Sequence, residues 1–358
     1  MRVLTVNAGS SSLKLSLLDH DDETITSAEL AAPQARVDDG KLRDALRANG
    51  LDAADAVGHR IVHGGARFTE AVAIDDSVER ALRGLVDLAP LHQPKSLAAL
   101  DAVSAALPDL PAVACFDTSF HTTIPEAART YALPAEWRER WELRRFGFHG
   151  LSHGWVARRV DAPRVVSCHL GAGASLCAIR DGRSIATTMG FTPLEGLTMA
   201  TRSGSIDPGL ILWLLEHGEL DEATLASALE HKSGLLGLTG TADMRDVLER
   251  AAAGDERAIL GRDVYLHHLR AGVAAMAATL GGLDALAFTG GVGERAAEIR
   301  ARAADGLAFL GVALDDGANA GAQPGADISA PEATVHTYVI AAREDREIAR
   351  QVRALLAR

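Results

Sequence analysis

The stretch Val6-Asn7-Ala8-Gly9-Ser10-Ser11-Ser12-Leu13-Lys14 interrupts an apolar run near the start of the chain. Apolar residues precede it at 3–6 and follow it at 13–18, which predicts two strands joined by a polar tip. Gly9 allows a tight turn and a close approach of the backbone to a ligand, and the amide, hydroxyl and lysine groups suit an anion. The tip therefore has the composition of a phosphate cradle, although Ser, Asn and Gly are also the usual residues of a solvated turn.

The same organisation recurs in the middle of the chain. A strand expected over 165–169 ends at Leu170-Gly171-Ala172-Gly173-Ala174-Ser175, and a returning strand is expected over 176–179. The repetition predicts two similar lobes, whose two tips could hold one polyphosphate between them. A third glycine cluster, Gly290-Gly291-Val292-Gly293-Glu294, follows a strand expected over 285–289 and precedes a helix, a context in which backbone groups hold nucleotides. Neither GxGxxG nor GxxxxGK[ST] accompanies these clusters.

Length and composition narrow the class of protein. The 358 residues are roughly twice a typical domain, which favours two domains around a cleft. No apolar run reaches the roughly eighteen residues needed to span a bilayer, and no secretory h-region follows Met1, so we expect a cytoplasmic protein without a membrane partner. Three cysteines without CxxC spacing indicate reduced core thiols. A net charge of -12 argues against a nucleic-acid partner.

Charged side chains follow two further strands of the predicted sheets. Arg60 and His63 lie at the end of a strand over 56–62, and Asp117 follows a buried strand over 111–116, where α/β sheets place ligands. Residues 19–56 are polar, acidic and alanine-rich and are expected to form surface. Helices are expected over 76–88, 95–107, 136–143, 152–160, 208–217, 221–231, 243–252, 256–280 and 344–356, and a last strand over 335–340.

Seven segments in chain order resemble the acetate kinase family: 6–14, 58–65, 88–92, 116–121, 146–150, 188–196 and 289–294. The resemblance implies an α/β fold of two duplicated actin-like (ribonuclease H-like) lobes flanking an active-site cleft, as in sugar kinases. It also implies an N-terminal lobe over 1–118 completed by the C-terminal helix 344–358, and a C-terminal nucleotide-binding lobe over 119–343. The reaction implied is reversible phosphoryl transfer between ATP and acetate, giving ADP and acetyl phosphate with Mg²⁺ or Mn²⁺, in a homodimer.

The resemblance assigns roles to residues that match the family's motifs. Catalytic roles fall on Arg60, Asp117, His149 and Arg202, of which Arg60 also binds the carboxylate substrate. The pocket for the substrate's methyl group is assigned to Val62, Leu91, Phe148 and Pro193. Nucleotide and phosphate contacts are assigned to Asn7, Ser10, Ser12, Lys14, His169, Gly171, Gly173, Gly290, Gly291 and Gly293. The metal ion is assigned to Asn7, Asp117 and Glu344.

Judged outside the family context, the same residues have simpler interpretations. His149 between Phe148 and Gly150 would more often be a hydrogen-bonded structural histidine. Arg60 and Arg202 would be surface or ion-paired residues, and Asp117 a turn or cap former.

Three segments depart from the family pattern on the nucleotide side. Ala172 replaces an asparagine, and Arg295 and Arg343 are additional cations. We therefore expect ATP use with loose base selectivity, and pyrophosphate as a minority alternative donor. A propionate kinase, or a nucleotide-binding homologue without turnover, remains an alternative function.

Overall fold

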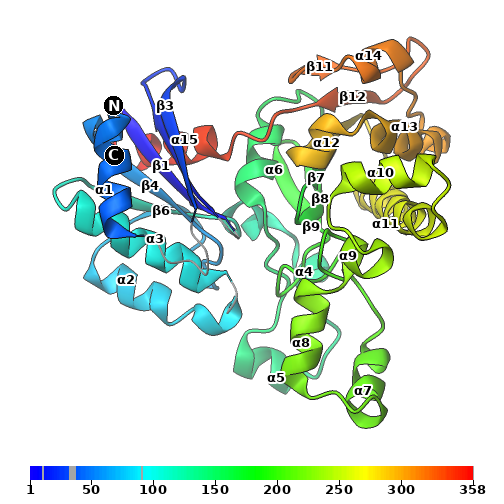
Figure 1. The fold of residues 1–358 in the computed structure, drawn as a ribbon, viewed down its shortest axis with the longest axis horizontal. Helices are drawn as coiled ribbons and strands as arrows, with labels where there is room; N and C mark the ends of the chain where they lie inside the picture. Colours follow the sequence, from blue (N-terminus) through cyan, green and yellow to red (C-terminus); the bar gives the residue numbers. More distant parts are fainter. Residues whose placement is uncertain (10–11, 32–37, 90–91, 358) are drawn as a thin grey trace. The chain divides into compact units, whose positions relative to one another are not determined.

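The computed structural model describes residues 1–9, 12–31, 38–89 and 92–357 (Figure 1). The chain forms two compact units. Unit 1 comprises Met1–Thr122, Phe148–Trp155 and Arg343–Arg358, and unit 2 comprises Thr123–Gly147 and Val156–Ala342. Each unit contains one six-stranded mixed sheet with helices packed on it.

The two sheets have the same topology. In unit 1 the strand order is β3-β2-β1-β4-β6-β5, and in unit 2 the corresponding order reads β9-β8-β7-β10-β12-β11. In unit 1, β3, β2 and β1 pair in antiparallel fashion, β4 and β6 run parallel to β1, and the short edge strand β5 is antiparallel to β6. The corresponding strands of unit 2 pair in the same way. The strands are β1 (Val3–Ala8), β2 (Ser12–Leu18), β3 (Thr24–Ala31), β4 (Ala56–Ile61), β5 (Val72–Ala73), β6 (Ala112–Phe116), β7 (Arg164–Leu170), β8 (Ala174–Arg180), β9 (Arg183–Thr187), β10 (Ala285–Thr289), β11 (Ala326–Asp327) and β12 (His336–Val339). This equivalence confirms the predicted duplication.

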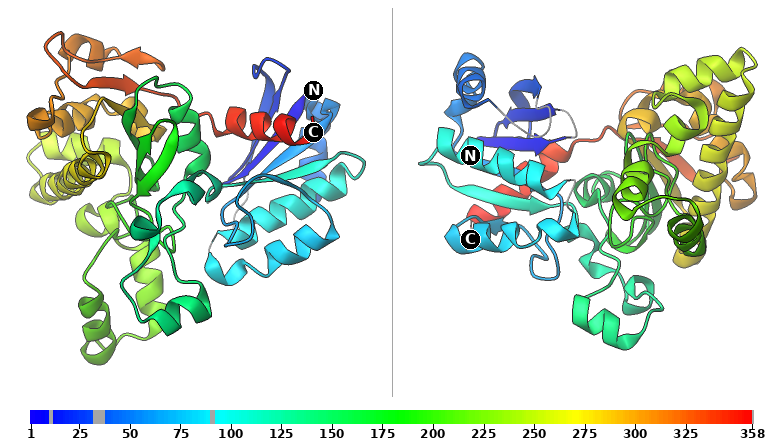
Figure 2. Two further views of the ribbon diagram at one scale, coloured as in Figure 1. Left: turned by 180° about the vertical axis from the view of Figure 1, so that it is seen from behind. Right: turned by 60° about the horizontal axis from the view of Figure 1, so that its bottom comes forward.

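Helices occupy most of the remaining described chain (Figure 2). The α-helices are α1 (Asp39–Ala48), α2 (Asp76–Arg83), α3 (Gln93–Ala106), α4 (Glu126–Arg129), α5 (Ala135–Trp141), α6 (Gly150–Ala157), α7 (Pro208–His217), α8 (Glu222–His231), α9 (Gly234–Thr239), α10 (Met244–Ala252), α11 (Glu256–Leu280), α12 (Gly290–Arg295), α13 (Ala297–Asp305), α14 (Asp316–Ala320) and α15 (Glu344–Leu356). Single 3-10 turns are η2 (Leu51–Ala53), η3 (Val86–Leu88), η4 (Ser119–Thr123) and η5 (Ala308–Leu310).

The sheet of unit 1 is buried on both faces. Successive side chains of a strand point to opposite faces, so Leu4 packs with Val103 of α3 and the leucines of α1, whereas Val3 packs with Ile348 of α15. The chain's last helix therefore completes the core of the unit that contains its first strand. This packing brings the N-terminus of α15 to the sheet that carries β1 and β4.

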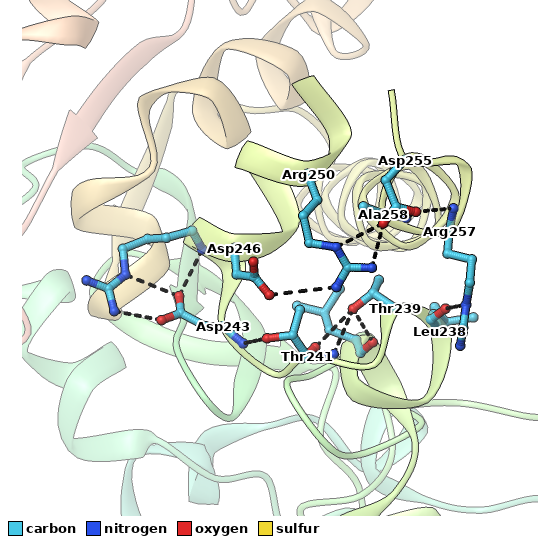
Figure 3. Close-up of polar contacts among 11 residues, drawn as sticks. Leu238, Thr239, Thr241, Asp243, Asp246, Arg250, Asp255, Arg257 and Ala258 are labelled. Carbon is cyan, nitrogen blue, oxygen red and sulfur yellow. Dashed lines mark hydrogen bonds and ion pairs between the residues drawn. The ribbon is translucent and has the colours of Figure 1, made fainter. Parts of the chain in front are cut away.

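Unit 2 is built around the 25-residue helix α11. Asp255 caps its N-terminus by accepting hydrogen bonds from Arg257 N and Ala258 N, and Asp255 Oδ2 also pairs with Arg250 Nη2 at 2.6 Å (Figure 3). Asp243 caps α10 in the same region, where Arg245 Nη2 lies 2.6 Å from its Oδ2. Side-chain caps of this kind satisfy helix N–H groups that have no partner within the helix, which holds the turn between α10 and α11.

The structure corrects three sequence expectations. Residues 19–56 are not only surface, because they form β3 and α1 and bury Leu42, Leu46 and Leu51 in the core. The helix expected over 76–88 ends at Arg83, since Gly84 caps it and a 3-10 turn follows. The glycine cluster after β10 is itself helical, because α12 begins at Gly290 rather than after a turn.

Candidate functional site

Four polar residues of unit 1 converge at the carboxyl ends of its parallel strands. Asn7 lies near the end of β1, Arg60 in β4, Asp117 directly after β6, and Glu344 at the start of α15. Arg60 donates from Nε to Asp117 Oδ1 at 3.1 Å, from Nη2 to Asp117 Oδ2 at 2.5 Å, and from Nη1 to Asn7 Oδ1 at 3.1 Å. Asn7 Nδ2 donates to Glu344 Oε2 at 2.8 Å. We call these four residues the arginine cluster.

Burial and neighbouring charges shift the pKa values of Asp117 and Arg60 in the arginine cluster. Asp117 is 1% exposed, and burial raises its pKa to about 6, an effect that Arg60 opposes and Glu344 reinforces. Burial alone would lower the pKa of Arg60, but Asp117 and Glu344 outweigh burial and raise it, so Arg60 stays charged. A guanidinium has five N–H groups. Three N–H groups of Arg60 donate hydrogen bonds within the cluster, so two N–H groups remain for a carboxylate or phosphate ligand.

The segment Phe148-His149-Gly150 is held against the end of β6 in unit 1. Gly150 N donates to Asp117 O at 2.8 Å, and His121 Nε2 donates to Phe148 O at 2.9 Å. Burial lowers the pKa of His121 to about 4, so its imidazole is neutral. His149 takes the left-handed backbone conformation, with φ 56°, between these two anchored residues. The structure therefore brings the backbone of His149 beside Asp117.

Two residues that the sequence did not single out hold the turn after β4. Gln93 Oε1 accepts from His63 N at 3.2 Å, and Gln93 Nε2 donates to His63 O at 3.2 Å. Thr118 Oγ1 accepts from Gly64 N at 3.1 Å. The signal for Gln93 was its position directly after the matched segment 88–92, and Thr118 lies within the matched segment 116–121, directly after Asp117. Val62 and Phe148 are both buried in this unit.

The first hairpin tip contributes less to the arginine cluster than its composition suggests. Ser12 Oγ donates to Glu29 Oε1 at 2.6 Å, and Lys14 is exposed on β2, opposite Asn7 in register. Of the described tip residues assigned to phosphate, only Asn7 therefore joins the cluster. Ser10, also assigned to phosphate, and Leu91, assigned to the methyl pocket, lie outside the described residues.

Arg202 and Pro193 lie together in unit 2. Both belong to the long irregular segment between β9 and α7, and Arg202 Nη1 donates to Pro193 O at 2.7 Å. Arg202 Nε also lies 3.7 Å from Glu230 Oε2, which provides a partly neutralising carboxylate. The guanidinium of Arg202 is therefore held by a main-chain oxygen of its own loop and by a carboxylate of helix α8.

The glycines assigned to the nucleotide converge in unit 2. Gly171 N donates to Gly173 O at 2.9 Å across the tip of the β7–β8 hairpin. A Cβ on Gly171 would lie 3.8 Å from His169 Nε2 and 4.0 Å from Gly291 N, so the tip and the start of α12 are neighbours. Gly290 has φ 77°, and a Cβ there would lie 2.8 Å from Leu170 O, which requires glycine. Gly293 follows within the same helix.

The three departures from the family pattern differ in their surroundings. Ala172 and Arg295 are exposed near the glycines of unit 2. Arg343 belongs to unit 1, where its Nη2 pairs with Asp345 Oδ2 at 2.8 Å and donates to Thr24 Oγ1 at 2.8 Å. Arg343 is therefore paired with a carboxylate of its own unit.

A family model described as the Acetokinase family matches residues 37–350. This chain belongs to the acetokinase family. A protein named acetate kinase from Acetivibrio thermocellus is 39% identical over 396 residues, covering 99% of each chain. Among solved structures, a Porphyromonas gingivalis acetate kinase matches with TM-score 0.89 and 33% identity over 99% of each chain. A Francisella tularensis propionate kinase matches with TM-score 0.91 and 34% identity over 98% of each chain.

Membership in the acetokinase family confirms the predicted resemblance and the fold of two similar α/β lobes. It also makes the chain a phosphotransferase with a carboxyl group as acceptor. No helix in the described part of this acetokinase is long and apolar enough to cross a membrane.

Proposed function

We propose that this acetokinase transfers the γ-phosphoryl group reversibly between ATP and acetate, giving ADP and acetyl phosphate. The observation that carries the proposal is the arginine cluster, assembled from four segments far apart in the sequence, in a chain of the acetokinase family. A nucleotide-binding protein without turnover has no need for a partly buried guanidinium with two remaining N–H groups. That requirement favours the enzyme over the non-catalytic alternative.

In the proposed reaction an acetate oxygen attacks the γ-phosphorus while the bond to the β–γ bridging oxygen of ATP breaks, and ADP leaves. Little covalent work is required of the protein, so positioning and charge stabilisation dominate. Arg60 supplies a planar pair of donors that matches carboxylate and phosphate oxygens. Arg202 supplies a second guanidinium, and the imidazole of His149 donates to the oxygens of the migrating group.

The donor atoms of the arginine cluster fit a hard divalent cation. Asp117 and Glu344 offer carboxylate oxygens, Asn7 offers an amide oxygen, and Mg²⁺ prefers oxygen ligands with several retained waters. We propose that these three residues hold Mg²⁺, or Mn²⁺ in its place. When bound, the ion would neutralise charge on the nucleotide phosphates. Arg60 occupies both carboxylate oxygens of Asp117, so cation binding would also release donors of Arg60.

The phosphoryl donor is proposed to contact the glycines of unit 2 and His169. Backbone N–H groups at 171, 173 and 290–293 need only the absence of side chains to approach phosphates. Ser12 and Lys14 remain proposed phosphate contacts from the first hairpin, with the hydroxyl of Ser12 exchanging Glu29 for phosphate.

The selectivity for the phosphoryl donor follows from Ala172, which replaces the side-chain amide of the family's asparagine. One missing neutral hydrogen bond costs about 0.5 to 1.5 kcal/mol, which weakens nucleotide binding without abolishing it. We expect acetyl phosphate formation with ATP, and partial activity with GTP, when ATP, GTP and pyrophosphate are compared at equal concentration. Activity with pyrophosphate alone would overturn the ATP assignment, and Arg295 would then be the first residue to replace.

Substrate size is proposed to be set by Val62, Phe148 and Pro193, together with Leu91. Val62→Ala removes two methyl groups from a buried side chain and should improve propionate relative to acetate by up to roughly tenfold, the worth of about one methylene. The measurement is the ratio of the two kcat/KM values. An Ile61→Val variant is the matched control, because Ile61 packs in the core with Phe116 and Leu97. An unchanged ratio in Val62→Ala would remove Val62 from the site.

We further propose a homodimer formed through α7. This helix exposes four large apolar side chains within six residues: Leu210, Leu212, Trp213 and Leu215. A second copy of the chain offers the same self-complementary surface. Leu212→Asp should convert dimer to monomer in size-exclusion chromatography with light scattering, whereas Leu260→Asp, at an exposed site on α11, should not. A dimer that survives Leu212→Asp would place the interface elsewhere.

A cytoplasmic location is supported by three buried free cysteines and by the proposed use of ATP.

The proposal is tested by trapping acetyl phosphate as its hydroxamate, with ATP and Mg²⁺ and either acetate, propionate or butyrate as acceptor. We expect acetate to be preferred, propionate to be used more slowly, and butyrate to be poorest. A preference for propionate would reassign the chain as a propionate kinase. ATP binding without any hydroxamate product would support the non-catalytic alternative.

A further inference from the structure

A buried histidine of unit 1 has no hydrogen-bond partner in the described part of the chain. His59 lies in β4 and is 1% exposed, and neither Nδ1 nor Nε2 forms a hydrogen bond with any described residue. Polar side chains inside native proteins are almost always hydrogen-bonded, because leaving one unpartnered costs free energy. The family reaction described above does not use His59. Its unsatisfied nitrogens therefore point to a ligand of a different kind.

His59 lines a cavity of about 320 Å³ within unit 1. Apolar side chains line one part of the wall and come from β4, the segment after β5, the C-terminal half of α3 and the turn that follows: Val57, Ile74, Val103, Leu107, Pro108 and Leu110. A cavity of this size accommodates a small organic molecule. The rest of its surface is polar and includes the imidazole of His59 and three carboxylates.

The described charged residues that line the cavity are all acidic. They are Asp75, Asp76 and Glu79, and no lysine or arginine of the described chain lines it. Asp75 Oδ1 caps α2 through the N–H groups of residues 77 and 78, and Glu79 pairs with Arg83 at 2.5 Å. Asp76 has no ion-pair partner among the described residues. The cavity therefore presents net negative charge, whereas a site for acetate or phosphate needs positive groups.

Burial lowers the pKa of His59 to about 3, so its imidazole is neutral and offers one nitrogen as an acceptor. A neutral acceptor, an aliphatic wall and nearby carboxylates together favour a cation with an apolar body over an anion. A metal ion fits less well, because the described chain brings three ligand side chains within metal-binding reach only at Asp19, His20 and Asp21.

We propose that this cavity binds a small organic cation, an ammonium group carried on a short aliphatic body. The ammonium donates to the free nitrogen of His59 and is compensated by Asp76, while the aliphatic body contacts the wall formed by β4 and α3. His59 and Arg60 are consecutive in β4, so their side chains point to opposite faces of the sheet. The cation site is therefore separate from the arginine cluster, and it stands whether or not the proposed function does.

The test is isothermal titration calorimetry of the full chain with cyclohexylammonium, and with cyclohexanol as the neutral compound of the same shape. We expect cyclohexylammonium to bind about tenfold more tightly than cyclohexanol, the worth of one charge-assisted hydrogen bond. His59→Phe and Asp76→Asn should each weaken cyclohexylammonium binding. Asp87→Asn, which removes an exposed carboxylate outside the cavity, should leave it unchanged.

Three outcomes would overturn the cation site. They are no saturable binding of cyclohexylammonium, equal binding of cyclohexanol, and undiminished binding by both His59→Phe and Asp76→Asn. If His59→Phe fails to fold because a buried position has been changed, Asp76→Asn at the exposed rim decides alone.

Discussion

Arg60→Ala should lower turnover by on the order of a hundredfold or more, because it removes a charge-assisted donor pair from the developing charge of the transition state. It also leaves Asp117 buried without its cation. The pKa of that carboxyl would then rise further, so protonation would limit the loss of stability. Arg60→Lys keeps a positive charge but loses the planar pair of donors, and should lie between Arg60→Ala and the wild type.

The measurement for Arg60 is kcat with acetate, ATP and Mg²⁺, together with a thermal unfolding curve for each variant. Arg43→Ala serves as the control, because Arg43 is an exposed arginine of α1 in the same unit. Arg202→Ala should cause a loss similar to that of Arg60→Ala. A folded Arg60→Ala enzyme with near-normal kcat would remove Arg60 from the mechanism.

Gly150→Ala should abolish most activity through the backbone. A Cβ at position 150 would lie 2.1 Å from Asp117 O, and main-chain atoms cannot rotate away as a flexible side chain does. Either Asp117 or the start of α6 must move, and the hydrogen bond from Gly150 N to Asp117 O is lost. We expect at least a hundredfold fall in kcat, because displacing catalytic groups by about 1 Å has effects of this size.

Gly154→Ala on the same helix is the matched control for Gly150→Ala. There the nearest atom to a new Cβ is Phe120 Cδ2 at 3.3 Å, a ring carbon that has some freedom to adjust. It should therefore lose much less activity and stability. Comparable kcat values in the two alanine variants would contradict the structural role of Gly150.

The duplicated fold was predictable because both hairpins carry strong local signals. Apolar runs flank a glycine-bearing tip at 6–14 and again at 165–179, and the observed strands follow both patterns. Helices α7, α11 and α15 agree with their predicted limits, and α7 and α11 each begin after a capping aspartate and end before a glycine. Strand β3 and helix α1 were missed because their sequences are polar, and only a few leucines of the segment are buried.

The arginine cluster was predictable in membership but not in geometry. The family motifs single out Asn7, Arg60, Asp117 and Glu344, yet no local pattern shows that Arg60 binds both oxygens of Asp117 across 57 positions. The same limit explains Arg343, whose ion pair with Asp345 depends on how α15 begins. The cavity beside His59 also depends on packing between β4 and α3, which periodicity does not reveal.

Direct transfer of a phosphoryl group from ATP to a carboxylate can be followed by ³¹P nuclear magnetic resonance without a coupling enzyme. The wild-type protein is incubated with ATP, Mg²⁺ and acetate, and the spectra of ATP, ADP, inorganic phosphate and acetyl phosphate are recorded over time. We expect acetyl phosphate and ADP to appear in equal amounts, and ATP to re-form when acetyl phosphate and ADP are supplied instead. Unchanged ATP, or its conversion to ADP and inorganic phosphate without acetyl phosphate, would contradict the assignment.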